Sequence, residues 1–268
     1  MSASVAPHAA ILIDERRAAL RHAGFVAAIG AVCIASLWIT GFFDAQRFIE
    51  AGPALAQLFF EMVPPDFSRW QHWLKPLLDT LAMSIAGTVF AVVFSLPLAF
   101  LAAPNTTPNT IVYHLCRVIL SFFRSVPELI LGILFVAAVG FGALPGVLAL
   151  GLHSVGMVAK FYAEAIEHVD PKPLEAARAA GASPFQVITH AVLPQVLPQL
   201  ADITIYRWEY HFRASTVLGI VGAGGIGFEL IAALRVIEYA QVSAILLAIL
   251  ACVIVVDAIG ARLRKSLK

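Results

Sequence analysis

The sequence predicts an all-α polytopic membrane protein, a bundle of six membrane-spanning helices. The chain of 268 residues is 60% hydrophobic and only 13% charged, against about 45–50% and about 25% in typical soluble domains. Several apolar runs approach or exceed the ~18–20 residues that cross a bilayer. One polar stretch, residues 174–198, separates two strongly apolar regions. We expect no cleavable signal peptide, so the first span would itself direct insertion.

Apolar length and turn residues place the elements in order. We expect spans over 24–43, 77–103, 126–141, 147–163, 197–218 and 240–260, and shorter helices over 1–22, 48–62, 111–123 and 228–239. The helix over 48–62 has amphipathic spacing, and two prolines follow it. Asp79 or Thr80 is expected near the start of the second span, and Pro97 should kink it. Ser125 and Glu128 have the spacing of a capping box, which predicts a helix start near residue 126.

Positive charge is distributed unevenly between the connecting segments. With the N-terminus inside, twelve Lys and Arg residues fall in or beside cytoplasmic segments, and four fall in outer segments. Cytoplasmic loops of membrane proteins carry the excess of Lys and Arg. The sequence therefore predicts a multi-pass protein of the cytoplasmic (inner) membrane, with both termini and residues 174–198 in the cytoplasm.

Residues 174–198 predict two short helices joined by a break. Gly181 is suited to end the first, alanine-rich helix, because glycine adopts the left-handed conformation at a helix C-terminus without strain. Ser183, Pro184 and Gln186 form the pattern of a capping box that begins the second helix. Prolines at 194 and 198 are expected to bend the entry into the next span. An alanine-faced hairpin of this kind suits a groove on a partner protein.

The same stretch resembles the EAA loop of ABC-transporter permeases. Glu175, Ala176, Ala177, Gly181, Leu193 and Pro194 stand at the spacing of that loop, with Ala191 where the family often has Ile. The resemblance implies a six-span type I ABC importer permease bundle, with residues 171–198 as its cytoplasmic coupling loop. It implies two cytoplasmic ABC ATPase subunits that each receive one such loop. Glu175 would lie near a helix N-terminus, which favours a carboxylate.

The resemblance also implies which groups lie on other subunits. The chain has no G-x-x-x-x-G-K-[ST] pattern, so we expect ATP and Mg²⁺ on the partner ATPase and no cofactor on this chain. The chain would be a transport subunit and not an enzyme. An external substrate-binding protein, and a second permease that is either another copy or a paralogue, complete the expected assembly.

Three stretches resemble permeases of the phosphonate/phosphite type: residues 62–68 followed by 73–78, residues 124–128, and residues 212–227. The resemblance implies ATP-driven import of phosphonate, phosphite or a related phosphorus oxyanion by alternating access. Parts of the last two stretches recur in methionine-type permeases. A permease for methionine or another small solute is therefore the alternative.

The predicted fifth span carries charges that a membrane helix rarely holds. Because such charges face the bundle interior or a water-filled path, Arg213 and Arg207 are candidates to line the path of an anion, with Arg213 first. The remaining path candidates are Glu209, Ser215 and Thr216. Two alternatives stay open: Glu209 and Arg213, four residues apart, neutralise each other, or the span begins near Ala214 and leaves the charges at the surface.

A glycine-rich turn follows that span. Residues 222–227 fit G-x-G-x-x-G, which raises the alternative of a membrane-embedded enzyme with a dinucleotide site. No acidic residue lies about 20 positions further on, and a spanning run follows. We therefore interpret the turn as one that lines the gate, with glycines at Gly222, Gly224, Gly225 and Gly227.

The remaining composition excludes other classes. The net charge of +1 gives no reason to expect nucleic-acid binding, and the membrane is the expected lipid partner. The three cysteines and eight histidines show no metal-ligand spacing. The expected domains are 1–76 (N-terminal cytoplasmic helix, first span and external amphipathic segment), 77–262 (permease core) and 263–268 (basic cytoplasmic tail).

Overall fold

The computed structural model describes residues 6–267, with side chains from residue 15 onward. The chain divides into two compact units, residues 1–60 and 61–268. The first unit holds α1 (Ala6–Ile39) and nearly all of α2 (Ala45–Glu61). Residues 6–22 are helical as expected, but α1 is continuous, so the expected break between this helix and the first span is wrong; residues 1–5 lie outside the described residues. No proline interrupts α1 after its first turn, and Gly24 alone does not end a helix. Residues Glu15–Ile39 are long and apolar enough to cross a membrane.

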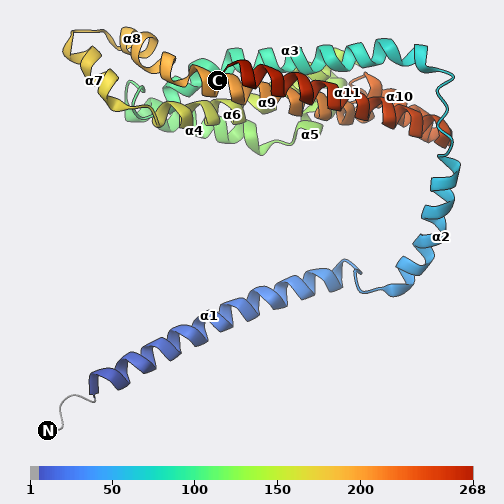
Figure 1. Ribbon diagram of the computed structural model, residues 1–268, viewed down its shortest axis with the longest axis horizontal. Helices are drawn as coiled ribbons and strands as arrows, with labels where there is room; N and C mark the ends of the chain where they lie inside the picture. Colours follow the sequence, from blue (N-terminus) through green and yellow to red (C-terminus); the bar gives the residue numbers. More distant parts are fainter. Residues whose placement is uncertain (1–5, 268) are drawn as a thin grey trace. The chain divides into compact units, whose positions relative to one another are not determined.

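The second unit is built from helices alone among its described residues (Figure 1). They are α3 (Trp70–Ala102), α4 (Thr110–Ser125), α5 (Glu128–Val139), α6 (Ala143–Glu167), α7 (Pro171–Ala179), α8 (Pro184–Val187), the π-helical turn η1 (Ile188–Val192), α9 (Leu193–Leu218), the 3-10 turn η2 (Gly219–Val221), α10 (Ile226–Arg235) and α11 (Tyr239–Ser266). In Figure 1, α7 and α8 lie at one end of this unit and α10 lies towards the other.

Among the described residues of the chain, four helices are long and apolar enough to span a membrane, and the number rises to six if each of two bent helix pairs counts as one span. One bent pair is α4 with α5, which meet at 81°. The predicted capping box there is wrong: the Ser125 hydroxyl donates to the carbonyl of Ser121 (2.7 Å), and α5 begins at Glu128 without a side-chain cap. Pro127 disfavours the helical conformation of the residue before it, and Val126 is extended (φ −90°, ψ 118°).

Helix α3 begins at Trp70, earlier than expected, and runs through Pro76 and Pro97. The predicted start near residue 77, with Asp79 or Thr80 at the helix end, is wrong. Asp79 instead forms an ion pair with Lys75 one turn back (3.3 Å), and the Thr80 hydroxyl donates to the carbonyl of Pro76 (2.8 Å). Both side chains therefore bond to residues one turn earlier inside the helix, and neither caps its N-terminus.

Helices α3 and α6 form the centre of the unit, and both pack against α9. The helices approach closely because glycines stand at the contact. A Cβ atom at Gly151 would lie 2.5 Å from the ring of Phe90, and one at Gly87 would lie 3.0 Å from Leu150.

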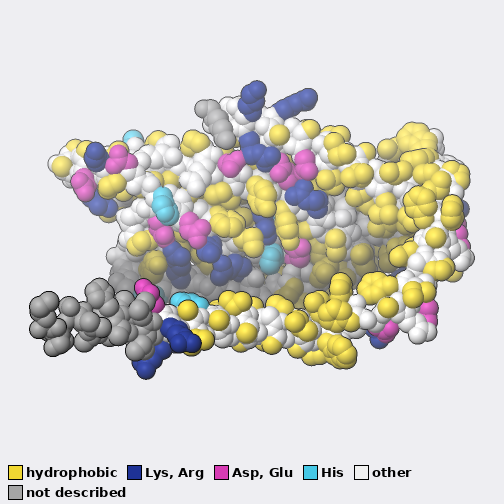
Figure 2. Space-filling model, turned by 60° about the horizontal axis from the view of Figure 1, so that its bottom comes forward, with side chains coloured by type: hydrophobic (Ala, Val, Ile, Leu, Met, Phe, Trp, Pro, Cys, Tyr) yellow, Lys and Arg dark blue, Asp and Glu magenta, His cyan; other side chains and the backbone are white. Residues whose placement is uncertain are grey.

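The outer surface of the unit is apolar. Val89, Phe94, Leu250 and Ile254 are each more than half exposed. Most side chains on the face shown in Figure 2 are hydrophobic, and charged side chains gather there in small groups of mixed sign. An apolar exterior around a packed helical core is the arrangement that a bilayer requires.

Candidate functional site

The alanine hairpin, residues 171–198, folds by local capping bonds. Helix α7 ends at Ala179, and Gly181 (φ 83°) terminates it from two residues further on. The N–H of Gly181 donates to the carbonyl of Arg178 (3.0 Å), and the N–H of Ala182 donates to the carbonyl of Ala177 (3.0 Å). These two bonds define the Schellman motif, in which glycine supplies the left-handed residue. The predicted helix end at Gly181 is confirmed.

The second half of the hairpin begins with the predicted capping box, which is also confirmed. Ser183 Oγ accepts from the N–H of Gln186 (3.4 Å), and Gln186 Oε1 accepts from the N–H of Ser183 (2.7 Å). Helix α8 then continues through η1 into α9, where the N–H of Leu193 donates to the carbonyl of Ile188, five residues back. Pro194 has no N–H to donate, and the wide turn lies directly before it. The second loop helix and the fifth span are thus one helical run.

The hairpin is anchored by apolar side chains and presents small ones. Leu174, Val187 and Val192 are buried in a cluster with the ends of α3, α4 and α6. Glu175 and Ala176 are exposed, and Ala177 is half-buried. Further along, Leu193 is half-buried and Pro194 is exposed. The outer face is hollowed by a shallow groove of ≈ 380 Å³ lined by Ala177, Ala180, Gly181, Ala182, Gln186 and His190.

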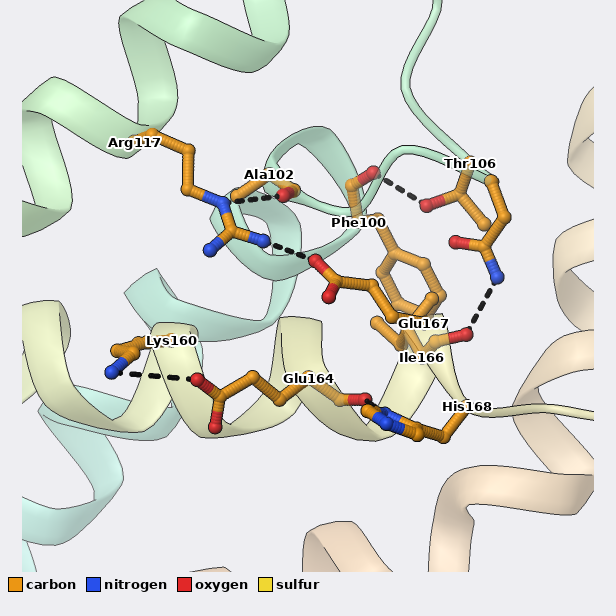
Figure 3. A network of polar contacts seen from close by, with 10 residues as sticks. Phe100, Ala102, Thr106, Arg117, Lys160, Glu164, Ile166, Glu167 and His168 are labelled. Atoms are coloured by element: carbon orange, nitrogen blue, oxygen red, sulfur yellow. Dashed lines mark hydrogen bonds and ion pairs between the residues drawn. The ribbon is translucent and has the colours of Figure 1, made fainter. Parts of the chain in front are cut away.

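A polar network fixes the bundle end on which the hairpin stands (Figure 3). Arg117 of α4 pairs with Glu167 at the end of α6, and its Nε donates to the carbonyl of Ala102 at the end of α3 (3.0 Å). The Nδ2 of Asn105 donates to the carbonyl of Ile166 (2.6 Å). The ends of α3 and α6 and the middle of α4 are therefore held in one arrangement, on which Leu174 of α7 packs.

Three ionisable side chains of α9 lie in the packed part of the bundle. Arg207, Glu209 and His211 are each at most 5% exposed. The alternative in which the span begins near Ala214 and leaves these charges at a surface is therefore wrong.

Arg207 is held by a hydroxyl and by an aromatic ring. Its Nε and Nη2 donate to Ser154 Oγ on α6 (2.9 and 2.7 Å), Nη1 donates to Met157 Sδ (3.2 Å), and the guanidinium lies over the ring of Tyr210 (4.3 Å to the centroid). None of the ion pairs among residues 15–267 includes Arg207. The guanidinium of Arg207 is therefore a buried positive charge without an ion-pair partner among these residues. The hydroxyl of Tyr210 in turn donates to Glu128 Oε1 (2.9 Å).

His211 continues the hydrogen-bond chain from Ser154. Ser154 Oγ lies 2.6 Å from its Nε2, and Thr88 Oγ1 on α3 lies 2.7 Å from its Nδ1. Because Ser154 Oγ already accepts from Arg207, its one hydrogen is free to donate to Nε2, and Nδ1–H then donates to Thr88. The Thr88 hydroxyl donates to the carbonyl of Ser84 (2.7 Å). With these donors and acceptors, both ring nitrogens of a neutral His211 are hydrogen-bonded, and the chain of bonds links α9 to α6 and α3.

Three charges of α9, those of Asp202, Glu209 and Arg213, pair with residues of α11. Arg264 Nη1 donates to Glu209 Oε1 (2.7 Å), and Arg213 Nη1 donates to Asp257 Oδ1 (2.9 Å). The alternative in which Glu209 and Arg213 neutralise each other is thus wrong for this chain, because each has a partner on α11. Arg213 and Asp257 are both half-exposed, with 42% and 47% of their side chains accessible.

The hydroxyls of Ser215 and Thr216 bond to their own helix. Ser215 Oγ donates to the carbonyl of Phe212 (2.8 Å), and Thr216 Oγ1 donates to the carbonyl of Arg213 (2.6 Å). Ser215 is buried, whereas Thr216 is half-buried. Both therefore lie on the helix that carries Arg213, one turn nearer to the glycine turn.

The glycine turn packs against α3. Gly222, Gly224 and Gly225 have φ of 98°, 74° and 70°, and a Cβ atom at Gly227 would lie 1.7 Å from the carbonyl oxygen of Thr216. The N–H of Ile226, the first residue of α10, donates to Thr80 Oγ1 (2.9 Å) and is buried. A dinucleotide site needs the free N–H groups of a helix N-terminus, and here a side chain of α3 occupies that place. The geometry does not support the dinucleotide alternative.

For some residues of these networks, no local pattern in the sequence predicts a contact with α9. Ser154, Thr88, Asp257 and Arg264 reach α9 from other helices, and no spacing within the sequence connects them to it. Among the described residues, no group of three or more His, Cys, Asp or Glu side chains could hold a metal ion.

Comparisons of the sequence and of the structure with known proteins all find transport permeases or their complexes. The binding-protein-dependent transport system inner membrane component family matches residues 95–268. The phosphite transport system permease protein PtxC of Stutzerimonas stutzeri is 63% identical over 248 residues, which cover 92% of this chain and 90% of that protein. The phosphate-import permease protein PhnE of Mycolicibacterium smegmatis is 40% identical over 87% of this chain and 44% of its own length. An inward-facing structure of the MetNI methionine ABC transporter superposes with a TM-score of 0.66 at 25% identity, covering 75% of this chain and 100% of that one.

Proposed function

Because the chain belongs to the family of binding-protein-dependent transport system inner membrane components, we propose that it is the permease of an ATP-driven importer of phosphite or a related phosphorus oxyanion. It is a permease subunit of an ABC importer, with the fold of a type I importer permease, and not an enzyme. The observation that carries the substrate class is the 63% identity, over nearly the whole chain, to a phosphite transport permease. Similarity to a methionine transporter is much lower, at 25% identity.

The charges of α9 support an anionic substrate. Arg213 is half-exposed and offers planar donors that match phosphorus oxyanions. Arg207 adds a buried positive charge that no described carboxylate neutralises within ion-pair distance. We therefore propose that Arg213 contacts the anion directly and that Arg207 makes the electrostatic potential along the path more positive. Glu209, Ser215 and Thr216 lie on the same helix, and the glycines at 222, 224, 225 and 227 form a turn that gates its outer end.

The assembly follows from the family, in which partner ATPases and a substrate-binding protein work with the permease. We propose two cytoplasmic ATPases, which carry ATP and Mg²⁺, and a second permease that is either a copy of this chain or a paralogue. The alanine hairpin docks the ATPase through Glu175, Ala176, Ala177, Gly181, Leu193 and Pro194. Its small, exposed face and rigid base support this role.

We place the protein in the inner membrane with both termini and the alanine hairpin in the cytoplasm. The excess of Lys and Arg in those segments supports this orientation. Residues 77–262 then form the permease core, with residues 1–76 before it and the basic tail 263–268 after it.

Uptake by the reconstituted complex tests the proposal. The chain, its ATPase and its binding protein are assembled in proteoliposomes, and uptake of phosphite is measured with ATP and with a non-hydrolysable analogue. We expect ATP-dependent phosphite uptake that methylphosphonate or phosphate reduces by competition and that excess methionine leaves unchanged. Uptake of methionine in place of phosphite would overturn the substrate class. ATP-independent uptake would overturn the transport mechanism.

A further inference from the structure

A second groove lies beside the alanine hairpin, on the side of the turn that joins α3 to α4. Its volume is ≈ 560 Å³. Residues 105–108 form one wall, and the other carries Arg178, Ala182, Val187 and Ile188 of the hairpin. Ala182 also lines the shallow groove on the outer face of the hairpin. The two hollows are therefore neighbours on one continuous surface.

The wall formed by residues 105–108 is preformed. The N–H groups of Thr106 and Thr107 both donate to the carbonyl of Ala103 (3.2 and 2.9 Å), and the Thr106 hydroxyl donates to the carbonyl of Phe100 (2.7 Å). Figure 3 shows this last bond beside the one that ties the turn to Ile166. A turn held by this many bonds offers a fixed surface, which lowers the ordering cost of binding.

Asn105 leaves one strong acceptor without a partner in this wall. Its Nδ2 donates to the carbonyl of Ile166 (2.6 Å), which fixes the orientation of the amide, because a carbonyl accepts only from a donor. Its Oδ1 is buried, and no described residue donates to it. The bond to Ile166 therefore ties this wall of the groove to the end of α6, whereas Oδ1 is closed to solvent.

Arg178 supplies the charge of the groove. Its Nη2 approaches the backbone carbonyl of Asn105 (3.4 Å), which is a weak bond, and its side chain is exposed. Beside Arg178 the floor of the groove is apolar and is formed by Ala182, Val187 and Ile188. The groove thus presents one cation next to an apolar floor.

We propose that this groove is a second contact for the partner ATPase. Its occupant is an ATPase segment that carries an apolar side chain for the floor and a carboxylate for Arg178. The proposal rests on the proposed function, in which the alanine hairpin docks the ATPase, because the groove continues that surface through Ala182. The turn after α3 then joins the coupling surface. Movement of the ATPase would act on α3 and α6 directly, through the turn and the bond to Ile166, as well as through the hairpin.

Site-specific photocrosslinking in the assembled complex tests this contact. A benzophenone amino acid is placed at Thr107 in the groove wall, at Ala180 in the hairpin, or at Ile237 between α10 and α11, at the other end of the unit. We expect the probes at 107 and 180 to crosslink to the ATPase and the probe at 237 not to do so. A probe at 107 that links only to a second permease copy, to lipid, or to nothing, while the probe at 180 links to the ATPase, overturns the second contact and leaves the hairpin docking intact. If neither links to the ATPase, the docking assignment fails as well.

A charge reversal with a matched control gives the second test. Arg178 and Lys172 are exposed cations on the same helix, and only Arg178 lines the groove. We expect Arg178→Glu to raise the ATPase concentration needed for half-maximal assembly by about tenfold, which corresponds to ~1.4 kcal/mol, and Arg178→Lys to restore most of it. Lys172→Glu should change it by less than about twofold. Equal effects of the two reversals would indicate general electrostatic attraction and would overturn the groove contact.

Discussion

Gly260 of α11 leaves the space that the carboxylate of Glu209 occupies. A Cβ atom at position 260 would lie 1.9 Å from Glu209 Oε1, the atom that accepts from Arg264 (2.7 Å). A buried carboxylate is stable only when it is paired and hydrogen-bonded. The glycine and the arginine, both on α11, therefore jointly permit an acid inside the bundle. This contact fixes the position of α11 along α9.

We predict that Gly260→Ala destabilises the protein, because the methyl group forces Glu209 away from Arg264. Overpacking of this kind costs about 1–3 kcal/mol, and the displaced carboxylate adds to the cost. The midpoint of thermal unfolding in detergent measures the effect. Gly30→Ala in α1 is the control, since nothing lies within 4 Å of its Cβ position, and it should leave the midpoint unchanged or raise it slightly. Equal midpoints for the two variants would contradict the packing argument.

We predict that Ser154→Ala destabilises the protein more than any single lost hydrogen bond would. Ser154 accepts two bonds from Arg207 and donates to His211, so alanine leaves several buried polar atoms without partners, at about 1–3 kcal/mol each. Ser95→Ala is the matched control. Ser95 is equally buried but makes one bond, to the carbonyl of Val155 (3.1 Å). Unfolding in detergent should show at least about twice the loss for position 154. A smaller loss than at position 95 would show that the Arg207 chain is not a stabilising network.

Local signals in the sequence predicted the alanine hairpin well. Gly181 and Ser183 act on backbone groups within four residues, so their pattern alone defines the caps. The bend before α5 was missed because Ser125 and Glu128 matched a capping box. The restriction that Pro127 places on Val126 outweighed that pattern.

Contacts between distant helices could not be predicted in the same way. Arg207 was predicted to line the path of an anion, and its contact with Ser154 was not predicted, because Ser154 comes from α6, 53 residues earlier in the chain. Glu209 and Arg213 looked like partners at a spacing of four residues, yet both pair with α11. The partner of a charged side chain depends on which helix packs against that side of its own helix. A single sequence does not show which helices are neighbours.

We predict that Arg213→Gln lowers phosphite uptake by about tenfold while the complex still assembles, because a planar cation is lost from the path. The ion pair with Asp257 requires a second variant to separate the two roles. In Arg213→Gln/Asp257→Asn both charges are removed, and an exposed pair contributes only about 0–1 kcal/mol to stability. If Arg213 contacts the anion, uptake stays low in the double variant. Recovery of uptake there would show that Arg213 serves only to neutralise Asp257.

We predict that Gly181→Pro uncouples ATP hydrolysis from transport. Proline fixes φ near −65° and has no N–H, whereas Gly181 has φ 83° and donates to the carbonyl of Arg178. The Schellman motif is therefore lost, and the angle between α7 and α8 changes. Uptake per ATP hydrolysed, measured in proteoliposomes, should fall by about tenfold or more, since each 1.4 kcal/mol of lost docking energy is tenfold in binding.

Two further variants separate conformation from contact in the hairpin. Gly181→Ala keeps the N–H, and no described atom lies within 4 Å of its Cβ position, so its cost is confined to the left-handed backbone, about 1 kcal/mol. It should therefore reduce coupling only partly. Glu175→Ala leaves the hairpin fold unchanged, because Glu175 is exposed, yet it should lower coupling if that carboxylate meets the ATPase. Normal coupling in both Gly181→Pro and Glu175→Ala would show that the motor acts on another surface of the permease.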